Sequence, residues 1–108
     1  MAKFEKKLSG NFDEIIATVE RGILNGSASA SLEEKSDFRG ETARCSVRVF
    51  ERFSSMGGNR VSLSVTLFQN GNEPIYLSAI ATGGSQAMFF KMNTFGEKAF
   101  LNKLEEIL

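Results

Sequence analysis

The chain has 108 residues, 42% of them hydrophobic, which is enough apolar material for one core. Lysine plus arginine equals aspartate plus glutamate at 13 each, so no overall charge favours binding to nucleic acid or to an anionic membrane. The single cysteine, Cys45, favours a reducing compartment, and no apolar run approaches the roughly 18 residues that span a bilayer. We therefore expect one soluble, cytoplasmic domain over residues 1–108.

Two segments have the periodicity of amphipathic helices. In the first, Asn11 precedes Glu14 by three residues, as in a capping box, and the segment ends at Asn25-Gly26. Its buried stripe comprises Phe12, Ile15, Ile16, Val19 and Ile23. The second begins with the capping pair Thr94 and Glu97 and runs to the terminus. Its stripe comprises Phe100, Leu101, Leu104, Ile107 and Leu108. Both helices need an apolar surface to cover.

The other segments alternate with the period of strands. Ala2 to Leu8 predicts a short edge strand, and a second strand begins at Ser27 with Ala28, Ala30 and Leu32 facing inward. If Arg39-Gly40 is a two-residue turn, Leu32 lies opposite Val47 and Ala30 lies opposite Val49. In the strand Thr42 to Phe53, the inward residues are then Ala43, Cys45, Val47 and Val49.

The next strand places Val61, Leu63, Val65 and Leu67 inward. A direct six-residue connection through Met56-Gly57-Gly58 would pair the wrong faces, so we expect an odd-length loop or a bulge near Phe50 to Phe53. After the turn Asn70-Gly71-Asn72, the inward residues are Ile75, Leu77, Ala79 and Ala81.

Gly83-Gly84 predicts a tight turn into a sixth strand, Gln86 to Met92, with Met88 opposite Ala79 and Phe90 opposite Leu77. The first strand would pair with this last strand. The expected fold is therefore a two-layer α+β domain, with an antiparallel meander sheet of about six strands and two helices on one face. The order is strand, helix, five strands, helix, and this topology resembles the helix-grip and TATA-binding-protein-like architectures.

Three stretches carry a closer resemblance: SASASLEEKSDF, CSVRVFERFSSMGGNRVSLSVTLF and LSAIATGGSQAMFFKMNTFGEKAF. They resemble a family of short Firmicutes proteins defined as a domain of unknown function. The resemblance implies a bacterial cytoplasmic protein, and it supplies no activity, cofactor or catalytic residue.

Catalytic chemistry finds little support in the residues. The chain has no histidine, and Cys45 on an inward strand position is more typical of a small core residue than of a nucleophile. Glu34 and Glu51 fall on the inward side near the ends of the sheet, where rim residues reaching solvent are the simpler interpretation. No metal-ligand pattern is present, so we expect no cofactor, no metal and no enzymatic activity.

Two surfaces remain as candidate sites. The first is an interface on the outward sheet face, formed by Arg44, Ser46, Arg48, Phe50, Ser62, Ser64, Thr66 and Tyr76. Arginine and aromatic residues are enriched at interfaces, although a solvated face with Glu33 neutralising Arg44 and Arg48 is an equal alternative. The second is an apolar pocket between the sheet and the last helix, formed by Met88, Phe90, Met92, Phe95 and Phe100, for which core packing is the alternative. We expect a homo-oligomeric binding or assembly module or, as the second hypothesis, a small apolar-ligand binder.

Overall fold

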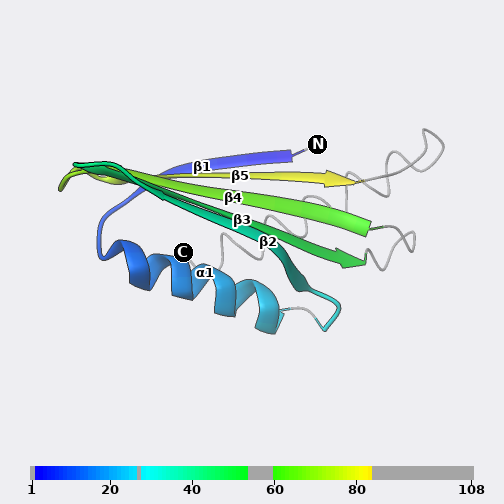
Figure 1. The fold of residues 1–108 in the computed structure, drawn as a ribbon. Coiled ribbons are helices and arrows are strands. Elements are labelled where there is room, and N and C mark those ends of the chain that lie inside the picture. Colours follow the sequence, from blue (N-terminus) through cyan, green and yellow to red (C-terminus); the bar gives the residue numbers. More distant parts are fainter. Residues whose placement is uncertain (1, 27, 54–59, 84–108) are drawn as a thin grey trace.

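The structure is a computed structural model that describes residues 2–26, 28–53 and 60–83. These residues form β1 (Ala2–Leu8), α1 (Phe12–Gly26), β2 (Ser31–Arg39), β3 (Ala43–Phe53), β4 (Arg60–Asn70) and β5 (Ile75–Gly83). The strands make one antiparallel sheet in the order β1-β5-β4-β3-β2, and α1 lies against one of its faces (Figure 1). We call the face toward α1 the inner face and the opposite one the outer face.

This architecture confirms an α+β fold with an antiparallel sheet. Over the described residues, however, the sheet has five strands and is accompanied by one helix, not six strands and two helices. The strand predicted at Gln86 to Met92 and the helix predicted from Thr94 lie outside the described residues.

Helix α1 forms as its sequence predicts. The backbone N–H of Glu14 donates to the Asn11 Oδ1 at 3.0 Å, which satisfies one of the free donors of the first turn. One stripe of the helix enters the core, and its buried members are Phe12, Ile16, Val19 and Ile23. The capping residue and the apolar period thus set the start of the helix and its orientation.

The β2–β3 hairpin has a different register from the predicted one. Gly40 N–H donates to the Ala43 carbonyl at 2.7 Å, so the two residues at the tip are Glu41 and Thr42. A bulge between Leu32 and Glu34 shifts the register further, and Leu32 pairs with Phe50. The predicted pairs of Leu32 with Val47 and of Ala30 with Val49 are therefore wrong.

The largest correction concerns β3. Phe53 pairs with Arg60 directly across residues 54–59, without the odd-length loop or bulge that the prediction required. Because side chains alternate along a strand, this register turns Arg44, Ser46, Arg48 and Phe50 to the inner face. The predicted inward set, Ala43, Cys45, Val47 and Val49, lies on the outer face instead.

Strands β4 and β5 follow the prediction. Leu63 pairs with Ala81, and Val65 pairs with Ala79, so both apolar faces coincide and are fully buried. The turn between the strands contains Gly71 at a φ of 57°, a left-handed conformation that glycine adopts without a steric penalty. The two strands form the centre of the core.

The position beside β5 is occupied by β1. Phe4 pairs with Ala79, and Leu8 pairs with Ile75, while β4 lies on the other side of β5. Ala79 and Leu77 therefore have their two neighbours in β1 and β4, and the predicted pairs with Met88 and Phe90 are wrong. The first strand does lie at an edge, but its partner is β5.

Candidate functional site: the outer face of the sheet

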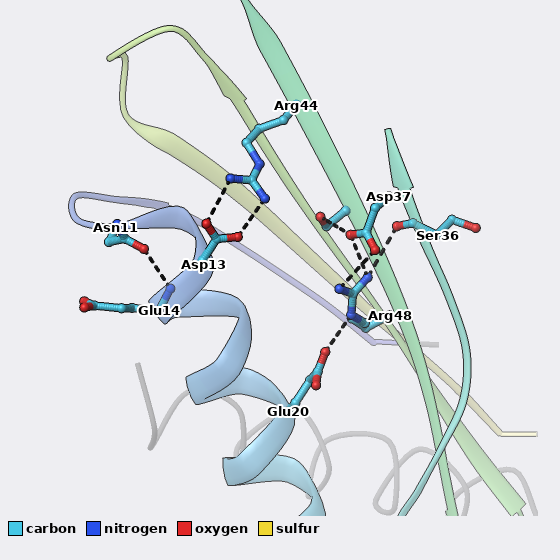
Figure 2. A network of polar contacts seen from close by, with 9 residues as sticks. Asn11, Asp13, Glu14, Glu20, Ser36, Asp37, Arg44 and Arg48 are labelled. Atoms are coloured by element: carbon cyan, nitrogen blue, oxygen red, sulfur yellow. Dashed lines mark hydrogen bonds and ion pairs between the residues drawn. The ribbon is translucent and has the colours of Figure 1, made fainter. Parts of the chain in front are cut away.

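The two faces of the sheet differ sharply in chemistry. Arg44 and Arg48 of β3, which the sequence analysis places on an outward interface, lie on the side of α1. They form ion pairs with Asp13 and Glu20 of that helix (Figure 2). Arg48 is only 6% exposed, and Ser46 and Phe50 beside it are also buried. A buried charge needs partners, and the partners of Arg48 come from three elements.

Arg48 is the centre of this network. Its Nε donates to Glu20 of α1 at 2.7 Å, and its Nη1 lies 3.1 Å from Asp37 of β2. The guanidinium also donates to the carbonyls of Ser36 and Val47, at 3.3 and 3.0 Å. Burial alone would lower the pKa of Arg48, but the hydrogen bonds to Glu20 and Asp37 outweigh it and raise the pKa. The arginine stays charged and connects its own strand, β3, to α1 and to the edge strand β2.

Asp37 has a second partner in this network. The hydroxyl of Ser46 donates to its Oδ1 at 2.6 Å. This hydrogen bond, followed by that from Arg48, holds the pKa of Asp37 below its ordinary value. Ser46 is therefore a buried donor within the fold and is not available at a surface.

Arg44 makes a similar connection at the start of α1. Its two terminal nitrogens donate to the carboxylate of Asp13 at 2.8 and 3.3 Å, and its guanidinium lies 4.0 Å from the centre of the Phe12 ring. The hydrogen bond from Arg44 lowers the pKa of Asp13. The alternative in which Glu33 neutralises Arg44 and Arg48 is wrong, because Asp13, Glu20 and Asp37 do so.

The predicted outward interface thus separates into two halves. Arg44, Ser46, Arg48 and Phe50 belong to the inner face, and their predicted outward orientation is wrong. The remaining members, Ser62, Ser64, Thr66 and Tyr76, do lie on the outer face. The candidate apolar pocket of Met88, Phe90, Met92, Phe95 and Phe100 lies outside the described residues.

The outer face is more apolar than its serines and threonines suggested. Every exposed large hydrophobic side chain of the described residues lies on it: Phe38 at 65%, Phe53 at 56%, Tyr76 at 46%, Phe68 at 42% and Ile80 at 37% exposure. Cys45, Val47 and Val49 lie between them, half-buried. Helix α1 lies against the other face (Figure 1), and none of the helices and strands of the described residues covers these side chains.

Strand register arranges this surface in rows across the sheet. We call one the aromatic row, formed in order across the sheet by Lys7, Tyr76, Phe68, Cys45 and Phe38. We call another the charged row, formed by Lys3, Ile80, Ser64, Val49 and Glu34. Each row thus begins with a lysine on β1. At the opposite edge of the sheet, on β2, the charged row ends with a glutamate.

A depression of about 420 Å³ opens at the β1 end of the aromatic row. Phe68 and Tyr76 contribute its aromatic surface, and Thr66 and Ser78 contribute hydroxyls. Glu5, Lys6 and Lys7 of β1 also line it, and the Lys7 ammonium lies 5.2 Å from the centre of the Tyr76 ring. The depression is therefore amphipathic and suits an aromatic side chain better than an isolated ion.

Three other candidates from the sequence fall on this face. Cys45 lies between Phe38 and Phe68 and does not point into the core. Glu34 and Glu51 are on the outer face, not the inner one. Glu51 forms an ion pair with Arg60 at 3.1 Å and accepts a hydrogen bond from the hydroxyl of Ser62.

Across the described ranges no cluster of three or more potential metal ligands occurs, and no helix there is long and apolar enough to cross a membrane.

Sequence reasoning missed Phe38, Phe53 and Ile80 on this face. For Phe53 one signal was available: pairing β3 with β4 directly through the six-residue connection places Phe50 inward, and Phe53 and the valines of β3 outward. With a six-residue connection, the alternation of side chains along the two strands fixes which residues of β3 face inward. That assignment is the opposite of the one that the apolar residues of β3 alone suggest.

The fold and this surface define a class of protein: a small α+β domain in which, over the described residues, a helix covers one face of the sheet and the other face exposes apolar side chains. Comparison of the sequence with family models places the chain more specifically. It belongs to the family of unknown function DUF6054, whose model matches residues 1–108. Searches of curated proteins and of solved structures found no match.

Proposed function

We propose that this protein is a non-enzymatic binding or assembly module that self-associates through the outer face of its sheet. One observation carries the proposal: all the exposed large hydrophobic side chains of the described residues gather on that face. A contiguous apolar surface with aromatic residues is typical of protein interfaces. A sheet face that is exposed to water carries mainly polar side chains instead.

The size of the face supports a stable contact. Five strands spaced about 4.8 Å apart and about eight paired residues rising about 3.3 Å each give about 600 Å² per copy. Two copies would bury about 1,200 Å², the lower end of the range for specific protein interfaces. The small side chains of Ser62, Ser64 and Thr66 along the middle strand let a second sheet approach closely.

Sedimentation velocity and light scattering over a range of concentrations test this proposal. We expect a concentration-dependent oligomer, and we expect Phe68→Lys to shift it toward monomer because a lysine replaces an exposed ring on the middle strand of the face. Asn72→Lys is the matched control, since it adds the same charge in an exposed turn away from the sheet. A wild-type protein that stays monomeric at high concentration would overturn the proposal.

Cys45 offers a second measurement. Its thiol lies on the outer face between two aromatic residues. Self-association should slow its alkylation as concentration rises, and Phe68→Lys should remove that protection. Alkylation that does not depend on concentration in a proven oligomer would place the interface elsewhere.

A binder of small apolar ligands remains the second hypothesis, and its predicted pocket residues lie outside the described part of the chain. Native mass spectrometry of the purified protein would test it by detecting a retained ligand. A cytoplasmic location, inferred from the single cysteine, also stays a prediction.

A further inference from the structure

We infer that the partner of the outer face is a second copy of this chain, related by a two-fold axis that runs parallel to the strands and passes over β4. The inference rests on the proposed function and specifies its geometry. In this arrangement β1 of one copy lies over β2 of the other, β5 lies over β3, and each β4 faces its equivalent. The two sheets keep nearly the same strand direction, as in aligned sheet packing.

The first argument is the charge at the two edges of the sheet. The charged row begins with Lys3 on β1 and ends with Glu34 on β2, at opposite edges of the same chain. An axis parallel to the strands brings Lys3 of each copy to Glu34 of the other and forms two ion pairs. Both side chains are exposed and can adjust to meet.

The other simple axis lies across the strands, and it produces a repulsive contact. It would place β1 over β1 and reverse the order of the rows. Lys3 of one copy would then approach Lys7 of the other, and the two copies of Glu5 would face each other. Like charges facing across an interface disfavour a wrong arrangement. The axis parallel to the strands also sets Arg60 of β4 opposite its equivalent, but each Arg60 is already paired with Glu51 of its own chain at 3.1 Å. Charge therefore favours the axis parallel to the strands.

The second argument is shape. Phe38 is the most exposed large hydrophobic residue of the described chain, and it lies at the β2 end of the aromatic row. The depression bordered by Lys7, Phe68 and Tyr76 lies toward the opposite end of the same row. The axis parallel to the strands brings Phe38 of each copy to the depression of the other. One surface thus supplies both the projecting ring and its recess, as a two-fold interface requires.

Charge reversal tests the axis directly. Lys3→Glu gives a homodimer with glutamate facing Glu34 twice, and Glu34→Lys gives one with lysine facing Lys3 twice. Each variant should weaken its own dimer by about tenfold. An equimolar mixture of the two variants restores both ion pairs in the heterodimer, so the mixture should associate with nearly the wild-type dissociation constant.

The controls separate the geometry from the general effect of charge. Arg21→Glu makes an equivalent change on α1, on the other side of the sheet, and Glu73→Lys repeats the change of the second variant in the exposed turn between β4 and β5. Neither control should change self-association, and mixing the two should have no effect. Circular dichroism of each variant verifies that the fold is kept.

The outcomes distinguish the two proposals. A heterodimer formed preferentially from Lys3→Glu and Glu34→Lys supports the axis parallel to the strands. A wild-type dimer that Phe68→Lys disrupts, with no recovery in the charge-swapped mixture, overturns the axis and leaves the outer-face interface standing. A monomeric wild type overturns both.

Discussion

Replacing Arg48 with alanine should be one of the most damaging single changes in the described part of this protein. The guanidinium contacts Glu20 at 2.7 Å, Asp37 at 3.1 Å and two backbone carbonyls. Breaking a buried ion pair costs about 3–5 kcal/mol. The two carboxylates keep side-chain exposures of 29% and 53%, so water can partly replace the arginine. We therefore expect a loss of about 2–3 kcal/mol in the free energy of unfolding.

In a domain of this size such a loss lowers the melting temperature by about 10–20 °C. Differential scanning calorimetry and urea unfolding both measure it. Arg21→Ala is the matched control, because it removes an exposed arginine from α1 and should change stability by less than about 0.5 kcal/mol. A double-mutant cycle with Glu20→Ala should also reveal a coupling energy between the two side chains. If Arg48→Ala costs no more than Arg21→Ala, or if the coupling is absent, the network does not stabilise the fold.

Three further predictions concern local features. Asn11→Ala should cost about 1 kcal/mol in urea unfolding because α1 loses its cap, whereas Asn11→Ser should restore most of it; equal stabilities would contradict the capping role. Gly71→Ala should lower the melting temperature, because alanine pays about 1 kcal/mol or more at a φ of 57°, whereas Gly71→Asn should be milder. Asp37 has a lowered pKa in the fold, so its ion pair contributes stability above the ordinary value of 3.8, and that contribution is lost as the pH falls below it. Asp37→Asn should therefore be less stable than wild type at neutral pH and should lose less stability on acidification, and parallel pH curves would contradict this.

The sequence predicts the parts of the fold in which the apolar pattern is unambiguous. In α1 the stripe from Phe12 to Ile23 has the helical period and follows a capping residue. In β4 and β5 every second residue is apolar, and each of those side chains is buried. Large aliphatic residues with a strict period have only one face that can enter a core.

Strand β3 could not be oriented in this way, because the charges on its inner face have partners far away in the chain. Arg48 is 28 residues from Glu20 and 11 from Asp37. No local pattern indicates that these carboxylates will compensate a buried arginine, so composition assigned the arginines to the outward face. The connection length gave the better information, since register is fixed by parity and not by average hydrophobicity.

This correction changes how the interface must be tested. When β3 is interpreted from composition alone, Arg48→Glu is the natural substitution for disrupting an interface. In the structure it would place a third carboxylate beside Glu20 and Asp37 under the helix, and the protein would lose its fold before it lost a partner. Phe68 and Lys3 are the appropriate positions, because both are exposed on the outer face.

The neighbour of β5 also lay beyond local reasoning. A tight turn favours pairing with the next segment, but β1 takes this position from the other end of the described chain. The sequence supports this pairing only because Ala2, Phe4 and Leu8 are apolar and alternate with polar residues, which places them on the inner face. Many short segments have such a pattern, so it does not identify the neighbour of β5.

The two edge strands carry features that discourage the addition of further strands. β1 carries lysine at three of its seven positions, and one of them, Lys6, is aligned with the inner face. β2 is interrupted by a bulge and turns Asp37 to the inner side. Natural sheets use lysines, bulges and inward charges of this kind to prevent edge-to-edge aggregation. Both borders of the described sheet therefore disfavour the addition of a further strand, so self-association through the proposed outer-face interface would not extend into a fibril.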